Sequence, residues 1–315
     1  MKIVILDAAT LGADIDLGGF LELGEVVKHP LTLPQQVAER IDDCDVCIVN
    51  KVKLNEDVLK GAKKLKLICV SATGYDNIDT QYCKGRGIAV CNVAGYSVNS
   101  VSQLTLAMVL SASVNLWEYK QSVCDGSYTS GGVQNILTPV YHELCGKVWG
   151  IIGYGAIGKK VGDAAKALGC RVVVNKRTPI AEEECLSLEE LIKISDIITI
   201  HTPLTEETRN LIGEKEIALM KDGVFLVNVA RGAVTDEGAV AKAIENGKIG
   251  FFGCDVYSQE PMPKDNPLFA VKDRKNVCLT PHMAWGASEA RNRCVREIAL
   301  NASTFFAGEI RNRIV

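Results

Sequence analysis

The chain has 315 residues, of which 47% are hydrophobic, and a formal net charge of −3 at neutral pH. This length suggests about two domains of roughly 150 residues each. The weak negative charge argues against the binding of nucleic-acid phosphates as the main task. The sequence contains no run of about 18 apolar residues, the length that a transmembrane helix needs, so we expect no membrane span.

The cysteines do not form a pattern typical of disulfides or metal sites. Twelve are present, and the one C-x-x-C pair, Cys44 and Cys47, has no second pair or histidine beside it to complete a metal site. Those within Val46–Ile48 and Leu67–Val70 lie in apolar runs, where a thiol acts as a small hydrophobic side chain. The first residues, Met1–Leu6, have the pattern of a strand and not that of a signal peptide. We therefore expect no metal, and a protein of the reducing cytoplasm.

Along the chain, short apolar segments alternate with helical ones, which is typical of an α/β protein with parallel sheets. In the first hundred residues we expect two helices, over 34–41 and 56–61. The strands expected in the same part of the chain are Ile3–Leu6, Val46–Val49, Leu67–Val70 and Ala89–Cys91.

A long helix is expected to begin between Ser97 and Ser100 and to run past Trp117. Because nearly every face of this segment is apolar, we expect the helix to be buried on all sides, at an interface between domains or subunits. The polar and glycine-rich residues 125–138 predict a loop after it.

The most informative feature is a glycine-rich turn. An apolar strand leads into a G-x-G-x-x-G pattern formed by Gly153, Gly155 and Gly158. Such glycines permit a tight turn, the approach of the backbone to a pyrophosphate, and close packing of the following helix. A helix over 156–168 and a second strand over 170–175 complete the strand–turn–helix–strand context. Because a helix N-terminus favours phosphate, the sequence predicts a dinucleotide cofactor.

The rest of the chain continues the alternation of strands and helices. The last segment, 288–306, predicts one amphipathic helix, and the simplest topology returns it to the first domain. The predicted fold class is α/β, with two Rossmann- or flavodoxin-like parallel-sheet domains, the cofactor domain being inserted into the substrate domain. We expect residues 1–98 and 286–315 to form the substrate domain and residues 99–285 the NAD(P)-binding domain. Further strands are expected at Ile197–Ile200, Val224–Val227, Gly250–Val256 and Val277–Leu279.

Three polar segments follow predicted strands and carry Arg231, Glu260 and His282. Ligands of doubly wound sheets bind at the carboxyl ends of strands, so we expect these residues to share one cleft. Arginine can hold a carboxylate bidentately, histidine is an acid–base at neutral pH, and a hydrogen-bonded glutamate favours the charged histidine. The set fits reduction of a 2-oxo acid, with His282 donating a proton to the carbonyl oxygen while nicotinamide delivers hydride. Each residue alone also has an ordinary explanation, as a surface ion pair, a loop charge or a backbone hydrogen bond.

Six segments, in this order, resemble the D-isomer-specific 2-hydroxyacid dehydrogenase family along nearly the whole chain. The resemblance implies that Arg231, Glu260 and His282 are the catalytic residues. It also implies that Thr73 and Gly74 hold the substrate carboxylate through N–H groups. The six segments are 70–79, 150–158, 201–212, 228–237, 255–261 and 280–286.

The same resemblance implies two sets of binding residues. Asp255 would hold the nicotinamide carboxamide. The substrate would contact Lys51, Ala72, Thr73, Gly74, Arg231, His282 and Trp285. The cofactor would contact Gly153, Tyr154, Gly155, Ala156, Ile157, Gly158, Asn175, Lys176, Arg177, Thr178, His201, Thr202, Pro203, Thr208, Val229, Ala230, Arg231, Asp255 and His282.

Within the family the chain is most similar to glycerate dehydrogenase, also called hydroxypyruvate reductase. The similarity rests on Trp285 and on residues 50–52, 91–97 and 265–268. It implies reduction of hydroxypyruvate or glyoxylate to D-glycerate or glycolate. Trp285 either lines the substrate pocket or only packs, and Lys51 is either a surface charge or a cation beside the substrate. The helix pattern and the family together imply a homodimer formed through the cofactor domain.

The second strand of the predicted cofactor unit, over 170–175, departs from the pattern that is usual in NAD-binding proteins. In NAD-binding units it usually ends in an acid that binds the 2′-hydroxyl, but here it ends in Asn175, followed by Lys176, Arg177 and Thr178. Without a carboxylate nothing repels a 2′-phosphate, and two cations could bind it. We therefore expect NADP(H) in preference to NAD(H). The alternative is that both cations are solvated and NADH dominates.

Other functions share many of these features. A second 2-hydroxyacid dehydrogenase activity, on phosphoglycerate or lactate, is the nearest alternative. A cofactor-sensing protein, similar to the corepressors that keep this fold, would bind the cofactor with little turnover. A purely structural Rossmann domain would not explain why Arg231, Glu260 and His282 occur together.

Overall fold

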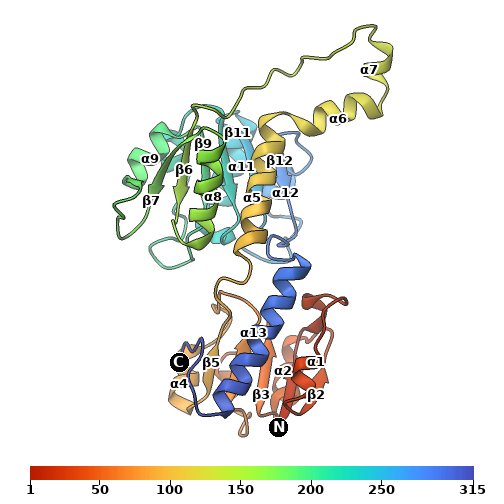
Figure 1. Ribbon diagram of the computed structural model, residues 1–315, viewed down its shortest axis with the longest axis vertical. Coiled ribbons are helices and arrows are strands. Elements are labelled where there is room, and N and C mark those ends of the chain that lie inside the picture. The colour runs from red at the N-terminus through yellow and green to blue at the C-terminus, as the bar shows by residue number, and fades with distance from the viewer. The chain divides into compact units, whose positions relative to one another are not determined.

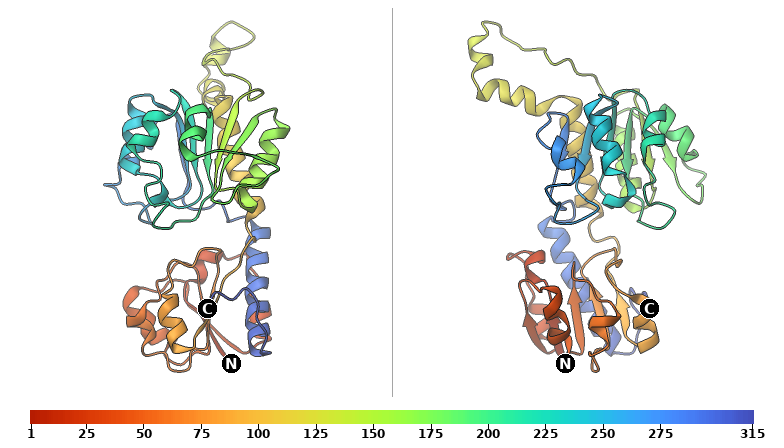
Figure 2. Two further views of the ribbon diagram at one scale, coloured as in Figure 1. Left: turned by 90° about the vertical axis from the view of Figure 1, so that its left-hand side faces the viewer. Right: turned by 180° about the vertical axis from the view of Figure 1, so that it is seen from behind.

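The computed structural model describes residues 1–315. The chain divides into two compact units, each built around one parallel sheet (Figures 1 and 2). Unit 1 consists of Met1–Ser97 and Gly286–Val315, and unit 2 consists of Val98–Trp285. The predicted α/β fold class with two parallel sheets is thereby confirmed.

Unit 1 has five parallel strands in the order β2-β1-β3-β4-β5, which is the flavodoxin-like order. The edge strand β2 was not predicted, because it has only two half-buried valines between exposed charged residues. The strands are β1 (Lys2–Ile5), β2 (Glu25–Lys28), β3 (Val46–Val49), β4 (Leu67–Val70) and β5 (Ala89–Cys91).

Helices cover both faces of this sheet. On one face α2, α3 and α4 contribute Val37, Leu59 and Cys83 to a core shared with the strands. The last helix, α13, packs against β4, as expected from its amphipathic pattern. The buried Asn301 of α13 donates a hydrogen bond to the Asn92 carbonyl at 3.0 Å. The elements are η1 (Ala8–Leu11), α1 (Gly18–Leu21), η2 (Pro34–Gln36), α2 (Val37–Ile41), α3 (Glu56–Leu59), α4 (Thr80–Arg86) and α13 (Ser288–Phe306).

Unit 2 has seven parallel strands in the order β12-β11-β10-β9-β6-β7-β8. Numbered from β6, this is the Rossmann order extended by one strand, and the chain reverses direction across the sheet between β6 and β9. The strand β8 was not predicted, and it has only two residues. The strands are β6 (Val148–Ile152), β7 (Arg171–Asn175), β8 (Glu184–Cys185), β9 (Ile197–Ile200), β10 (Val224–Asn228), β11 (Ile249–Cys254) and β12 (Val277–Leu279).

Two separate cores lie on the faces of this sheet. One contains Met108 and Val161 from α5 and α8 together with the fully buried Trp149, whose indole donates to the Thr199 hydroxyl at 3.1 Å. The other contains residues of four further helices and the second set of strand side chains, such as Leu226. The helices are α5 (Val98–Ser113), α8 (Ala156–Ala167), α9 (Leu188–Ile194), α10 (Glu214–Leu219), α11 (Glu237–Glu245) and α12 (Pro267–Val271), with η3 (Gly232–Val234).

The prediction of one long helix that runs past Trp117 is wrong. The helix α5 ends at Ser113, and Asn115, with φ of 49°, separates it from α6 (Leu116–Cys124). Within the single chain only part of the surface of α5 packs, and Leu110 is 40% exposed. The helices α6 and α7 (Ser127–Ser130) then form an arm that projects away from the sheet of unit 2 (Figure 1). None of the helices combines the length and the hydropathy that a membrane span requires.

We predict that Leu226→Ala lowers the free energy of unfolding of unit 2 by about 2–5 kcal/mol, because it leaves a cavity in a close-packed core. Leu226 is fully buried, whereas Leu219, the matched control in the same unit, is 42% exposed, and its Ala variant should change stability by less than about 0.5 kcal/mol. Denaturant unfolding followed by tryptophan fluorescence measures this, since Trp117, Trp149 and Trp285 all lie in unit 2. Equal losses in the two variants would contradict the packing.

Candidate active site

The glycine-rich turn follows β6 directly. Gly153 has φ of 90°, and a Cβ atom there would lie 2.5 Å from the Thr202 nitrogen. A Cβ on Gly158 would lie 2.3 Å from the Gly153 carbonyl oxygen, so the first turn of α8 rests against the end of its strand. Both positions therefore need glycine, as the sequence pattern predicts.

Gly155, the N-cap residue of α8, has the opposite surroundings. It is exposed, and a Cβ built on it would meet no atom within 4 Å. The first N–H groups of the helix, at Ala156, Ile157 and Gly158, have no partner within the helix by geometry. Open space beside these donors fits a pyrophosphate, and a side chain at 155 would project into that space.

A cavity of about 310 Å³ continues from this turn to the loop after β7, lined among others by Tyr154, Lys176 and Ile180. The Tyr154 hydroxyl donates to Glu183 at 2.6 Å, and Lys166 of α8 binds both oxygens of the same carboxylate at 2.7 Å. Tyr154, the variable residue inside the glycine pattern, thus ties the loop after β7 to helix α8.

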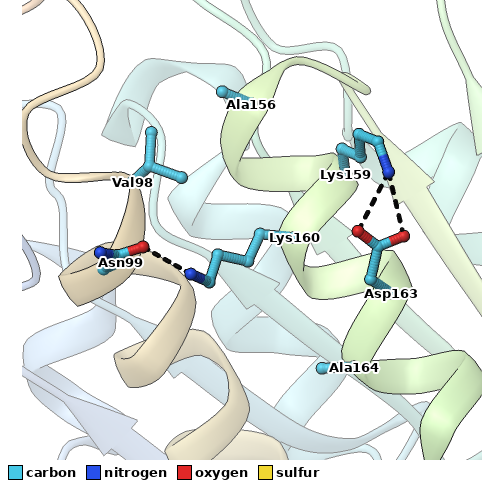
Figure 3. A pocket seen from close by; sticks show the side chains of 7 residues that line it. All are labelled: Val98, Asn99, Ala156, Lys159, Lys160, Asp163 and Ala164. Atoms are coloured by element: carbon cyan, nitrogen blue, oxygen red, sulfur yellow. Dashed lines mark hydrogen bonds and ion pairs between the residues drawn. The ribbon is translucent and has the colours of Figure 1, made fainter.

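A larger, open cavity of about 470 Å³ lies between α5 and α8, on another side of the latter helix (Figure 3). Its two lysines are engaged with neighbours. Lys160 donates to Asn99 at 2.5 Å, and Lys159 binds both oxygens of Asp163 at 3.0 and 3.2 Å (Figure 3). Its lining lacks Gly155, which lines the smaller cavity, so we place the candidate cofactor site at the smaller cavity.

The residues predicted to choose between the two cofactors lie at the end of β7. Asn175 donates its side-chain amide to the Leu186 carbonyl at 3.0 Å, so it is used in the fold. Lys176, Arg177 and Thr178 are exposed. The Thr205 hydroxyl and, more weakly, the charge of Arg177 lower the pKa of Glu207, so Arg177 faces the loop after β9.

The loop after β9 begins with a histidine that has no hydrogen-bond partner in the protein. Both ring nitrogens of His201 are buried, and burial lowers the pKa of the ring to about 3, so the imidazole is neutral. Thr202 is half-buried and Pro203 exposed. The Thr208 hydroxyl donates to the Pro203 carbonyl at 2.7 Å and accepts the Thr205 N–H at 2.7 Å, so it shapes the loop.

The turn that carries Arg231 follows β10 and is folded by the buried Asn228. Its side chain accepts the Ala230 N–H at 3.0 Å and donates to the Arg231 carbonyl at 2.9 Å. Val229 is buried, and Ala230 accepts a hydrogen bond from the Arg231 guanidinium at 2.8 Å. A Cβ on Gly232 would lie 2.0 Å from the backbone of residue 257, so this turn packs directly on the segment that leads to Glu260.

Glu260 and His282 form the pair that the sequence analysis predicts. The Nδ1 atom of His282 lies 2.6 Å from Oε2 of Glu260, and the two side chains are 21% and 29% exposed. Glu260 also accepts the Tyr257 N–H at 3.1 Å through Oε1. Because the carboxylate can only accept, Nδ1 carries the hydrogen of this contact.

The loop of His282 is organised by the buried Asp255. One oxygen accepts the Thr280 hydroxyl at 2.5 Å and the Met283 N–H at 2.9 Å, and the other accepts the Ala284 N–H at 2.8 Å. Burial raises the pKa of Asp255, and these donors oppose the shift. His282 itself has φ of 52°, a conformation that a non-glycine residue adopts only under strong surrounding constraints. Asp255 therefore has a structural role beyond the carboxamide contact that the resemblance implies.

Two further residues of unit 2 hold this region. Trp285 donates its indole N–H to the His282 carbonyl at 3.1 Å. The buried Glu237 accepts the Ser258 N–H at 2.7 Å, the Ser258 hydroxyl at 2.5 Å and the Asn266 side chain at 2.8 Å. No sequence pattern predicted a role for Glu237, because its partners are 21 and 29 residues away and only the fold brings them together.

In unit 1 the predicted substrate residues lie on two loops at the carboxyl edge of the sheet. Lys51 follows β3 and is exposed, and its N–H donates to the buried Asp7 at 2.6 Å. Thr73 and Gly74 follow β4, with Ala72 half-buried before them. The Thr73 hydroxyl donates to the Val93 carbonyl at 2.9 Å.

Comparison with known proteins identifies the family. Residues 106–284 match the family described as D-isomer specific 2-hydroxyacid dehydrogenase, NAD binding domain. The glycerate dehydrogenase of Methylorubrum extorquens is 34% identical over 311 residues, covering 99% of this chain and 98% of that enzyme. The hydroxypyruvate reductase of Blautia hydrogenotrophica is 35% identical over 317 residues, covering 98% of each.

A solved structure of a related dehydrogenase has the same fold as this chain. The D-lactate dehydrogenase from Aquifex aeolicus, complexed with NAD and lactic acid, has a TM-score of 0.86 to this chain at 29% identity, covering 98% of this chain and 96% of the other. The chain belongs to the D-isomer-specific 2-hydroxyacid dehydrogenase family, a family of nicotinamide-dependent oxidoreductases.

Proposed function

We propose that this protein reduces hydroxypyruvate, and glyoxylate as a second substrate, to D-glycerate and glycolate. The observation that carries the proposal is the 2.6 Å contact between Glu260 and His282, on loops that follow neighbouring strands. Relatives along nearly the whole chain that are named glycerate dehydrogenase and hydroxypyruvate reductase support this choice of substrate.

In this proposal His282 is the acid–base. Nicotinamide, when bound, supplies the hydride. Glu260 accepts the Nδ1 hydrogen and stabilises the imidazolium, so that Nε2 can donate its proton to the carbonyl oxygen of the substrate. Arg231 pairs with the substrate carboxylate through its planar guanidinium. Asp255 accepts the Thr280 hydroxyl before His282 and the Met283 N–H after it, and so helps the ring to keep its direction toward Glu260.

We assign the remaining predicted residues to binding. The N–H groups of Thr73 and Gly74 hold the carboxylate of the substrate, and Lys51 and Trp285 contact the rest of it. The turn Gly153–Gly158, the loops after β7, β9 and β10, and Asp255 hold the cofactor. In these roles unit 1 is the substrate domain and unit 2 the cofactor domain.

For the cofactor we propose that NADPH is preferred to NADH. The loop after β7 has no carboxylate where a 2′-hydroxyl is usually bound, and it exposes Lys176 and Arg177. Together with the Thr205 hydroxyl, the charge of Arg177 lowers the pKa of Glu207, so this cation lies on the side of the loop after β9.

We further propose a homodimer in the cytoplasm. The segment from Val114 to Tyr141 exposes many large apolar side chains, which a second copy of this segment would cover. Eight of the twelve cysteines are buried, and burial raises the pKa of thiols such as Cys47 and Cys69, so they remain protonated in the core. The exposed apolar residues are Val114, Leu116, Trp117, Val123, Tyr128, Val133, Leu137, Val140 and Tyr141.

The first prediction concerns turnover. The wild type should oxidise NADPH or NADH in the presence of hydroxypyruvate, and His282→Ala should lower kcat by about 10²–10⁴-fold, because the proton donor is lost. His142→Ala, an exposed histidine between α7 and β6, is the matched control and should leave the rate unchanged. A wild type that binds cofactor tightly but reduces no 2-oxo acid would favour a sensor. Turnover of lactate- or phosphoglycerate-type substrates alone would favour the other dehydrogenases.

The second prediction concerns the cofactor. Arg177→Ala should raise the KM for NADPH by about 10-fold or more, the effect of losing one hydrogen bond to a charged phosphate, and should leave the KM for NADH nearly unchanged. Arg209→Ala, an exposed arginine on the loop after β9, serves as control. The preference for NADPH is refuted if the NADPH KM of Arg177→Ala equals that of the wild type.

The third prediction concerns assembly. Light scattering coupled to gel filtration should give twice the chain mass of 34.0 kDa. Trp117→Glu, which places a charge on the 59% exposed indole position of the arm, should give monomers. Leu219→Glu, also an exposed apolar position of unit 2, should remain dimeric. A wild-type protein of single-chain mass would exclude the dimer.

A further inference from the structure

A buried carboxylate that the proposed mechanism does not use lies in unit 1. Asp7 follows β1, and the loop Asn50–Val52 follows β3, the strand beside it in the sheet. The strand order reverses between these two strands, and ligands of such sheets bind outside the carboxyl ends at this point. Asp7 is only 3% exposed, so it can affect a ligand only through the loop that it holds in place, and not by direct contact.

Asp7 accepts backbone N–H groups from three successive residues. Its Oδ1 accepts the Asn50 N–H at 3.0 Å, and its Oδ2 accepts those of Lys51 at 2.6 Å and Val52 at 3.3 Å. Burial raises the pKa of Asp7, and the three donors oppose that shift. A carboxylate is the only side chain that can accept from every donor of this loop, because it has two oxygens and no hydrogen to donate.

The carbonyl side of the same loop is held by Asn77. Its amide donates to the Asn50 carbonyl at 3.3 Å and to the Val52 carbonyl at 2.9 Å. The backbone of Leu54 bonds Asn77 and Asp79 at 2.9 Å each, which joins this loop to the one that carries Thr73 and Gly74. The loop around Lys51 is thus held by two sets of hydrogen bonds, which we call its clamps. Asp7 accepts from its N–H groups, and Asn77 donates to the carbonyl groups of the residues on either side of Lys51.

We propose that Asp7 and Asn77 are positioning residues that fix the backbone of Lys51, so that its ammonium recognises 2-oxo acids with an oxygen substituent on C3. The inference rests on the proposed function. If the N–H groups of Thr73 and Gly74 take the carboxylate, the ammonium on the adjoining loop is a further donor at the same edge of the sheet. The C3 hydroxyl of hydroxypyruvate can accept a hydrogen bond from it. Glyoxylate has no C3 atom, so it leaves this donor unused.

Without the hydrogen bonds of Asp7 and Asn77, the ammonium of Lys51 would occupy many different positions. A lysine side chain has four rotatable bonds, and each binding event must order them. A fixed backbone limits the region that the ammonium can reach, which lowers that cost. The clamps therefore act on the KM for hydroxypyruvate and on the preference over glyoxylate, and leave kcat for glyoxylate unchanged.

The test is a double-mutant cycle, with the ratio of kcat/KM for hydroxypyruvate to kcat/KM for glyoxylate as readout. Lys51→Met should lower this ratio by about 10-fold or more, mainly through the KM for hydroxypyruvate. Asp7→Asn, which replaces one accepting oxygen by an N–H donor facing N–H donors, should lower it in the same direction. The double variant should be no worse than Lys51→Met alone, because both changes remove one interaction.

Two variants separate positioning from general loss of stability. Asp45→Asn is the matched control: Asp45 accepts the Lys2 N–H at 2.9 Å at the amino edge of the same sheet. It should lower the melting temperature without changing the ratio. Asn77→Asp, which removes the amide donor in a residue of equal size, should lower the ratio as Asp7→Asn does, and it serves if Asp7→Asn fails to fold.

The outcomes are distinct. Additive losses in the double variant would overturn the inference, and so would a ratio that stays at the wild-type value in Asp7→Asn and Asn77→Asp. In either case turnover by the wild type would leave the proposed function intact. A wild type without turnover of hydroxypyruvate and glyoxylate would overturn the function and the inference together.

Discussion

The parallel direction of every strand is the constraint on which the site depends. In each unit all strands end at the same edge of one sheet, so loops that are far apart in the sequence emerge side by side. Arg231, Glu260 and His282 follow three neighbouring strands of unit 2. No local sequence signal could bring them together without this shared direction.

Buried carboxylates then give these loops their shape. Asp7 in unit 1 and Asp255 and Glu237 in unit 2 each accept two or more hydrogen bonds from the loop that they hold. Burial of a charge is costly, and several N–H donors offset the cost only when the backbone takes one particular conformation. The same arrangement that stabilises the carboxylate therefore defines the loop. At His282 it also holds a left-handed backbone conformation that an unconstrained histidine rarely adopts.

Much of this could be predicted from the sequence, and the failures share a cause. Buried strands such as Val46–Val49 and Ile197–Ile200 have continuous apolar runs and were found at their observed bounds. The edge strand Glu25–Lys28 was missed, because its side chains are only partly buried and its composition resembles a loop. The helix after Ser97 was predicted too long, since Asn115 interrupts it by a backbone conformation that its residue type permits but does not require.

By itself the sequence determined the α/β class and the glycine turn, because each depends on residue type at short spacing, and it indicated the three polar residues, because each follows a recognisable apolar strand. The family followed from the order of six such segments. Only the tertiary structure decided which acids hold the loops in place. Asp7 accepts hydrogen bonds from a loop 43 to 45 residues away, and Glu237 from a loop 21 residues away. A buried carboxylate is defined by the donors around it, and those donors are backbone groups that every residue but proline possesses. Their arrangement in space therefore leaves no mark in the sequence.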